Sequence, residues 1–122
     1  FPYEINVTSQ DVDLLINITN DSWYGDTLAS YQHLMLAIPR SIENQKFLVR
    51  STYNGITAVI SPTGKILKKI NKNQSGYLIY EINLLEKKSF YVKNHFIINL
   101  IYYLILGLCI ILFFKKNSNT RF

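Results

Sequence analysis

Apolar and polar residues alternate along the first part of the chain in a pattern that predicts a strand followed by a helix. The nearly continuous apolar run from Val12 to Thr19 is bounded by polar residues, which is typical of a strand buried on both faces. From Thr27 to about Gln45, apolar residues recur at helical spacing, at Leu28, Tyr31, Leu34, Met35, Ile38 and Ile42. Pro39 lies inside this predicted helix, where a proline costs about 3 kcal/mol, so we expect a kink or a break there.

Short apolar runs predict four further strands, which cover Lys46 to Thr52, Ile56 to Ser61, Lys65 to Ile70 and Tyr77 to Ile82. Pro62, Thr63 and Gly64 join the second of these to the third, which favours a hairpin closed by a type I turn. The order of strand, helix, strand, hairpin and strand predicts a mixed α/β sandwich.

The 19 residues from Phe96 to Phe114 carry no charge and predict a transmembrane helix. At about 1.5 Å per residue they span roughly 28 Å, close to the ~30 Å hydrocarbon core of a bilayer. We therefore predict an incomplete globular domain at 1–86, a basic juxtamembrane linker at 87–95, the membrane helix at 96–114 and a basic tail at 115–122. Basic residues near the two ends of the helix balance, so the positive-inside rule gives no orientation.

The charge of the chain favours a membrane surface over nucleic acid as its partner. The formal net charge is +5, but many of the lysines flank the apolar segment and form no patch interleaved with aromatic residues. The single cysteine, Cys109, lies inside the predicted membrane helix, and His33 and His95 are far apart in sequence. We therefore predict no disulfide, no metal site and no cofactor.

The stretch TNDSWYGD, from Thr19 to Asp26, joins the first predicted strand to the helix and is a candidate site. Ligands in open α/β folds gather beyond the carboxyl ends of strands, so Trp23 either borders a ligand or packs under the loop. Asp21 and Asp26 either cap the helix and bond the loop backbone, which is the commoner use of such acids, or do acid–base work. No Gly-x-Ser-x-Gly motif surrounds a serine.

Further polar positions stand out in the predicted helix and strands. Arg40 and Glu43 are spaced i, i+3 and predict an ion pair on the helix face. Arg50 falls inside an apolar strand, so we expect it to be partly buried and to need a carboxylate or several carbonyls as partners. Asn54 and Gly55 predict a turn, from which the Asn54 side chain either points to solvent or enters a site.

Taken in order, these motifs resemble the C-terminal portion of the bacterial apolipoprotein N-acyltransferase family, whose nitrilase-like domain is embedded in a membrane protein. The similarity rests on Asn-Asp-x-Trp at Asn20 to Trp23, Gln-His at His33, Arg40 to Glu43, and Arg-Ser-Thr-x-Asn-Gly-x-Thr-Ala at Arg50 to Ala58. A terminal membrane helix with a basic tail is also similar. The departures from the family pattern are Ser22, Pro39, Ser41 and Tyr53. The implied fold class is the C-terminal part of a nitrilase-like α-β-β-α sandwich followed by one transmembrane helix.

The resemblance also implies where the chemistry lies. The family uses a Glu-Lys-Cys set whose cysteine shortly precedes a Phe-Pro-like pair. Since the chain opens at Phe1-Pro2 without a methionine, we expect a fragment with all three groups upstream and no catalytic residue of its own. The residues expected to border the substrate pocket are Trp23, Tyr24 and Asn54. Those expected to give structural support are Asp21, Asp26, Arg40, Glu43 and Arg50.

The activity that the resemblance implies is a two-step acyl transfer. A cysteine thiolate takes an acyl chain from a phospholipid as a thioester, and the amino group of a lipoprotein's S-diacylglyceryl cysteine then attacks it. The implied partners are the phospholipid donor, the apolipoprotein acceptor, membrane lipid and the remainder of the domain. The implied location is the bacterial inner membrane, with a periplasmic domain and a cytoplasmic tail. A membrane-tethered nitrilase-like amidase and a non-enzymatic, tail-anchored binding module are the alternatives.

Overall fold

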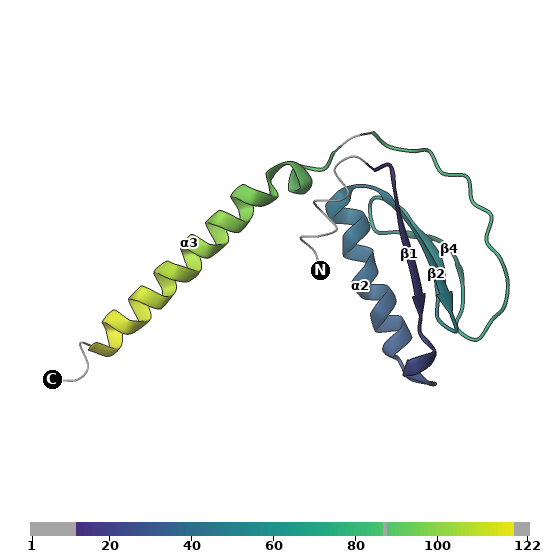
Figure 1. Cartoon of the computed structure of the whole chain (residues 1–122), viewed down its shortest axis with the longest axis horizontal. Helices are drawn as coiled ribbons and strands as arrows, with labels where there is room; N and C mark the ends of the chain where they lie inside the picture. The colour runs from purple at the N-terminus through teal and green to yellow at the C-terminus, as the bar shows by residue number, and fades with distance from the viewer. Residues whose placement is uncertain (1–11, 87, 119–122) are drawn as a thin grey trace.

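The structure is a computed structural model that describes residues 12–86 and 88–118, so the first 11 residues of the predicted domain and the end of the predicted tail lie outside it. The elements follow in the order β1 (Leu14–Asn20), η2 (Ser22–Tyr24), α2 (Ala29–Asn44), β2 (Phe47–Tyr53), β3 (Thr57–Ile60), β4 (Ile66–Ile70) and α3 (Phe90–Ser118). A four-stranded sheet carries α2 on one face, and α3 extends away as a separate helix (Figure 1). This architecture confirms the predicted class, an α/β domain followed by an apolar helix.

The sheet has the strand order β1-β2-β3-β4, with β1 and β2 parallel and the other pairs antiparallel. The parallel pair is joined through α2, as a βαβ unit requires. Asn20 at the end of β1 lies opposite Tyr53 at the end of β2, so both carboxyl ends meet at one edge of the sheet. The core beneath α2 is formed by Leu34, Leu48, Ile56, Ala58 and Ile60.

Helix α2 packs on the sheet with its small and polar residues, which the hydrophobic pattern did not predict. Its buried positions are Ser30, Leu34, Ala37, Ser41 and Asn44. The large apolar residues of the predicted stripe are mostly exposed, at Leu28, Tyr31, Met35 and Ile42, whereas Leu34 and Ile38 pack in the core. Small residues allow the helix backbone to approach the sheet closely, and this leaves an apolar face of α2 without a partner in the described residues.

Pro39 does not break α2, which is one helix from Ala29 to Asn44. The missing N–H of Pro39 leaves the carbonyl of Met35 without its intrahelical partner. Met35 is exposed, so water can take that place. Gln45, the residue after the helix, adopts a left-handed conformation, and the N–H of Lys46 donates to the carbonyl of Ser41, as in a Schellman motif.

The predicted hairpin is present, but the last predicted strand is not. The N–H of Gly64 donates to the carbonyl of Ser61 at 2.9 Å and closes the turn between β3 and β4. Residues 77–82 form neither helix nor strand, so the prediction for Tyr77 to Ile82 is wrong. This segment passes the sheet beyond β4 and is tied to it by a side chain, because Lys68 Nζ donates to the carbonyl of Ile79 at 3.0 Å.

Helix α3 is the one helix among the described residues that is long and apolar enough to cross a membrane, over Phe90–Lys115. It begins within the predicted linker and includes the predicted span 96–114. Its first turn packs on the end of α2, where Ser89 Oγ donates to the carbonyl of Glu43 and accepts from the N–H of Val92 at 3.0 Å. Val92 is buried at this junction, while the apolar residues beyond it are mostly exposed.

Candidate functional site

The candidate site lies where the parallel strands β1 and β2 end. The backbone N–H of Asp21 donates to the carbonyl of Tyr53 at 3.0 Å, which joins the residue after β1 to the last residue of β2. The short helix η2 and the Asn54-Gly55 turn continue from these two strand ends. Ligands of open α/β sheets bind at this position, and the prediction of a site here rests on that rule.

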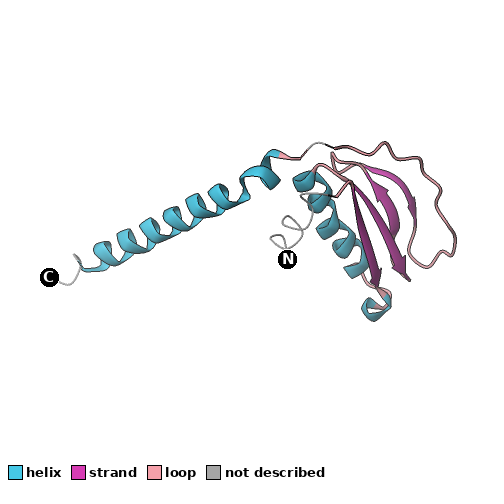
Figure 2. Cartoon of the chain, turned by 45° about the horizontal axis from the view of Figure 1, so that its top comes forward, coloured by secondary structure: helices cyan, strands magenta, loops and turns pink. Residues whose placement is uncertain are grey.

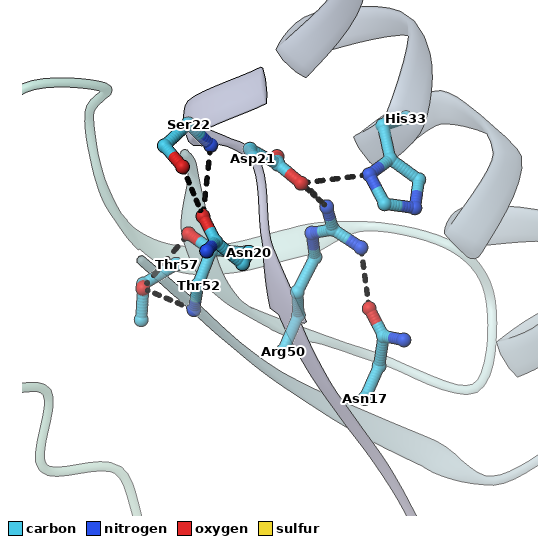
Figure 3. Close-up of polar contacts among 8 residues, drawn as sticks. All are labelled: Asn17, Asn20, Asp21, Ser22, His33, Arg50, Thr52 and Thr57. Atoms are coloured by element: carbon cyan, nitrogen blue, oxygen red, sulfur yellow. Dashed lines mark hydrogen bonds and ion pairs between the residues drawn. The ribbon is translucent and has the colours of Figure 1, made fainter. Parts of the chain in front are cut away.

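An ion pair without solvent contact lies beneath this edge (Figure 3). Arg50 Nη2 lies 3.1 Å from Asp21 Oδ2, and both side chains have 0% exposure. Arg50 Nη1 also donates to Asn17 Oδ1, while Arg50 Nε is buried without a partner in the described residues. Removing one member of such a pair leaves an uncompensated buried charge, so the pair holds β1 and β2 in one arrangement. Arg50 thus has the carboxylate partner that its place in an apolar strand predicted.

His33 connects this ion pair to α2. Its Nδ1 lies 2.8 Å from Asp21 Oδ1, and its ring packs edge-on against Tyr24 with the ring centroids 5.8 Å apart. Asp21 therefore binds groups from β2 and α2 and lies itself at the start of η2. This arrangement orients the imidazole, as a buried carboxylate does in many sites. Asp21 supports the fold of the loop here rather than capping α2.

Gly55 leaves the space that the Asp21 side chain occupies. A Cβ at position 55 would lie 2.3 Å from Asp21 Oδ2 and 2.8 Å from Asp21 Cβ, so a side chain cannot fit there without displacing the carboxylate. Asn54 precedes it with φ of +59°, the left-handed conformation that asparagine tolerates. The two motifs that carry Asp21 and Gly55 thus form one packed unit.

The outer side of the loop is held by Lys72, from the turn after β4. Its Nζ donates to the carbonyl of Gly25 at 2.6 Å, to Asp26 Oδ1 at 3.1 Å and to the carbonyl of Thr27 at 3.3 Å. Asp26 therefore pairs with Lys72, and the side-chain contact at the start of α2 comes from Thr27, whose Oγ1 accepts from the N–H of Ala29 at 3.3 Å. The loop is thus anchored on two sides.

The two aromatic residues of η2 differ in their contacts and in their exposure to solvent. Tyr24 packs against His33, whereas the side chain of Trp23 is 84% exposed and does not lie under the loop. Asn54 is also exposed at the same edge of the sheet. The structure therefore brings Trp23, Tyr24 and Asn54 to one end of the domain, and their part in substrate binding stays a prediction.

The remaining sequence candidates lie away from this edge. Arg40 Nη2 and Glu43 Oε1 are 2.9 Å apart near the end of α2, so this pair forms as its spacing predicted. Cys109 is exposed on α3. Among the described residues, no group of three or more His, Cys, Asp or Glu side chains is placed to hold a metal ion.

Three residues of the site were not singled out as supports in the sequence, namely Asn17, His33 and Lys72. Asn17 lies opposite Arg50 in the β1–β2 register, and His33 adjoins the buried stripe of α2 that includes Ser30 and Ala37. A helical projection of the small residues of α2 would have placed His33 beside the buried face of the helix. Nothing in the sequence distinguishes Lys72 from the other lysines of its region, because its contacts depend on the turn after β4.

Comparison with known proteins assigns the class that this fold and site suggest. The model of the carbon-nitrogen hydrolase family matches residues 1–89, and the chain belongs to that family. Its curated relatives include an apolipoprotein N-acyltransferase of Rickettsia typhi, 41% identical over 78 residues, which are 64% of this chain and 16% of that protein. The protein of the same name from Haemophilus ducreyi is 43% identical over 77 residues, 63% of this chain and 15% of its own length. The chain thus matches only a small part of these relatives.

Proposed function

We propose that the chain is the C-terminal part of an apolipoprotein N-acyltransferase, comprising the end of its catalytic domain and a membrane helix. The observation that carries this proposal is the 41–43% identity to proteins of that name over 77–78 residues of this chain. The carbon-nitrogen hydrolase match over residues 1–89, which include the Asp21–Arg50 unit, supports it. The candidate membrane helix α3 in the same chain supports it, since both the acyl donor and the acceptor of such an enzyme are lipids.

In the proposed reaction, a cysteine thiolate attacks the acyl ester of a phospholipid and forms a thioester, with the lysophospholipid leaving. The amino group of an S-diacylglyceryl cysteine then attacks the thioester, forms the amide and releases the thiolate. A glutamate acts as the acid–base group, and a lysine stabilises the oxyanion. In this proposal, the cysteine, the glutamate and the lysine lie in another part of the longer protein. The present chain is inactive by itself.

The described residues contribute support and the mouth of the pocket in this proposal. Trp23, Tyr24 and Asn54 border the mouth, and the Asp21–Arg50 pair with His33 keeps the loop in place. The remainder of the domain covers the face of the sheet opposite α2, where Ile16 and Ile18 of β1 are 66% and 80% exposed. Two exposed isoleucines on one face support such a partner, because exposed apolar patches mark interaction surfaces.

Thioester labelling tests the proposal on the full-length protein in membranes. A phospholipid with a labelled acyl chain should transfer its label to the protein in a bond that hydroxylamine cleaves. Replacing the site cysteine with serine should abolish thioester labelling, whereas Cys109→Ser should leave it unchanged because Cys109 lies on α3. Labelling that depends on Cys109, or no labelling together with release of ammonia from small amides, would contradict the proposal and favour an amidase.

The proposed orientation places the α/β domain in the periplasm and the residues after α3 in the cytoplasm. A fluorescent protein that matures only in the cytoplasm, fused after Phe122, should therefore fluoresce. A periplasmic reporter enzyme fused at the same place should be inactive. The opposite pair of results would reverse the orientation.

A further inference from the structure

The face of α2 that points away from the sheet carries an apolar stripe with no partner among the described residues. The stripe comprises Leu28, Tyr31 and Met35, which recur at helical spacing and are 42–73% exposed. Trp23, 84% exposed, extends it beyond the N-terminal end of the helix. Contiguous apolar patches of this kind mark interaction sites in folded proteins.

The stripe presents no uncompensated charge. The charged residues of α2 are Arg40 and Glu43, which pair with each other at 2.9 Å. The polar residues Ser30, Ser41 and Asn44 are turned toward the sheet and buried. Small and polar residues thus share the buried face of α2 with Leu34 and Ile38, while the apolar residues of the stripe face outward.

The position of α3 indicates what covers the apolar stripe of α2. The C-terminal end of α2 and the start of α3 are packed together through Ser89 and Val92. In Figures 1 and 2 the sheet lies on one side of α2, and α3 runs off on the other side. The outward face of α2 therefore looks toward the side on which α3 enters the membrane.

We propose that this face of α2, with Trp23 at its end, lies against the lipid surface of the membrane that α3 enters. Helices with one broad apolar face bind in the plane of the interface, and tryptophan and tyrosine prefer the headgroup region. The anchored loop supports this role, because Lys72 and Asp21 hold the segment on either side of Trp23 while its ring remains exposed. The mouth of the proposed pocket then opens at the lipid surface, where a phospholipid is already present.

Quenching of tryptophan emission by brominated lipid tests this docking. The full-length protein is reconstituted in vesicles of phosphatidylcholine that carries bromine on its acyl chains, and the emission of a Trp23→Phe variant is subtracted as background. We expect Trp23 to lose most of its emission. A tryptophan introduced by Met35→Trp in the Trp23→Phe background should lose emission in the same way.

Tyr77→Trp in the same background is the matched control. Tyr77 is 84% exposed, as Trp23 is, but it lies in the segment that passes the sheet on the side away from α2 (Figure 1). We expect its emission to be unaffected by bromine and to be quenched by acrylamide in the water. Leu28→Lys should in addition reduce the quenching of Trp23 by lipid, since it places a charge in the interface.

Equal quenching at positions 23 and 77, or none at 23 and 35, would overturn the proposal. Protection of these positions from both bromine and acrylamide would assign the stripe to another segment of the protein, or to a second copy if it depended on protein concentration. The measurement needs no acyl transfer. Intact thioester labelling without lipid quenching would therefore refute the docking and leave the proposed function standing.

Discussion

Asp21 and Arg50 form an ion pair that is closed to water and joins the ends of two parallel strands. The Nη2 and Oδ2 atoms are 3.1 Å apart, with both side chains at 0% exposure. The sequence already indicated that Arg50 needs a carboxylate or several carbonyls as partners, and the structure supplies a carboxylate from the loop that first suggested a site. The first predictions concern this unit.

Asp21→Ala should destabilise the domain by about 3–5 kcal/mol, because it leaves the Arg50 guanidinium buried and unpaired. Chemical denaturation of the full-length protein, followed by circular dichroism, measures the change. The double variant Asp21→Leu with Arg50→Met, which replaces the pair by apolar groups of similar shape, should recover much of this loss. A double variant as unstable as Asp21→Ala would show that the charge is not the cause.

Gly55→Ala should cost about 1–3 kcal/mol, since its Cβ would lie 2.3 Å from Asp21 Oδ2 and overpacking of this kind strains the site. Gly76→Ala is the matched control, because the nearest atom to its Cβ would be Ile70 Cδ1 at 3.4 Å, an ordinary contact. The two variants are compared by thermal denaturation. If Gly76→Ala lowered the midpoint as much as Gly55→Ala, the contact with Asp21 would not explain the effect.

Lys72→Met should loosen the loop from Gly25 to Thr27 with little change in global stability. The Asp26 partner is exposed, and exposed ion pairs contribute about 0–1 kcal/mol. The readout is amide hydrogen exchange, which should become faster in residues 22–28 only. Lys69→Met, which removes an exposed lysine from the adjacent strand β4, should leave exchange in the loop unchanged.

Leu106→Arg should impair insertion of α3 by about 2.5–3.5 kcal/mol, the cost of arginine near the centre of a membrane helix. An in vitro translocation assay with glycosylation sites on each side of the helix measures the inserted fraction. Leu106→Ala, which adds no charge, should insert nearly as well as the unaltered chain. Equal insertion of Leu106→Arg, Leu106→Ala and the unaltered chain would argue against a membrane span.

Residues 1–86 expressed alone should not melt cooperatively, because the face of the sheet that carries Ile16 and Ile18 would remain exposed. Differential scanning calorimetry and light scattering should show a broad transition and association. Replacing both isoleucines with lysine should reduce the association without restoring cooperativity. A sharp, reversible transition of the unaltered segment would contradict this prediction.

The sequence predicted the order of elements through β4 because local signals specify them. Apolar runs gave the strands, and the Pro62–Gly64 turn gave the hairpin. It failed for Tyr77 to Ile82, because a strand also needs a neighbour for its backbone, and that neighbour is not visible in local sequence. The spacing of the large apolar residues predicted the helix α2 but not its buried face, which Ser30, Ala37, Ser41 and Asn44 share with Leu34.

The candidate site was predictable in part. Arg50 was recognised because a charge inside an apolar strand demands a partner, and the loop was recognised from its place after a strand. The contacts of His33 and Lys72 were not predictable, because they join positions that only the folded chain brings together. Trp23 remained ambiguous in the sequence, and its exposure in the structure decides against burial under the loop.

The close approach of Gly55 to Asp21 has a consequence for how this family can change. Any side chain at position 55 displaces the carboxylate of Asp21. Loss of that carboxylate in turn leaves the buried Arg50 guanidinium without its counter-charge, which destabilises the fold. Substitution at any one of positions 21, 50 and 55 alone is therefore destabilising. Among members of this family, we expect the three residues to be retained or lost together.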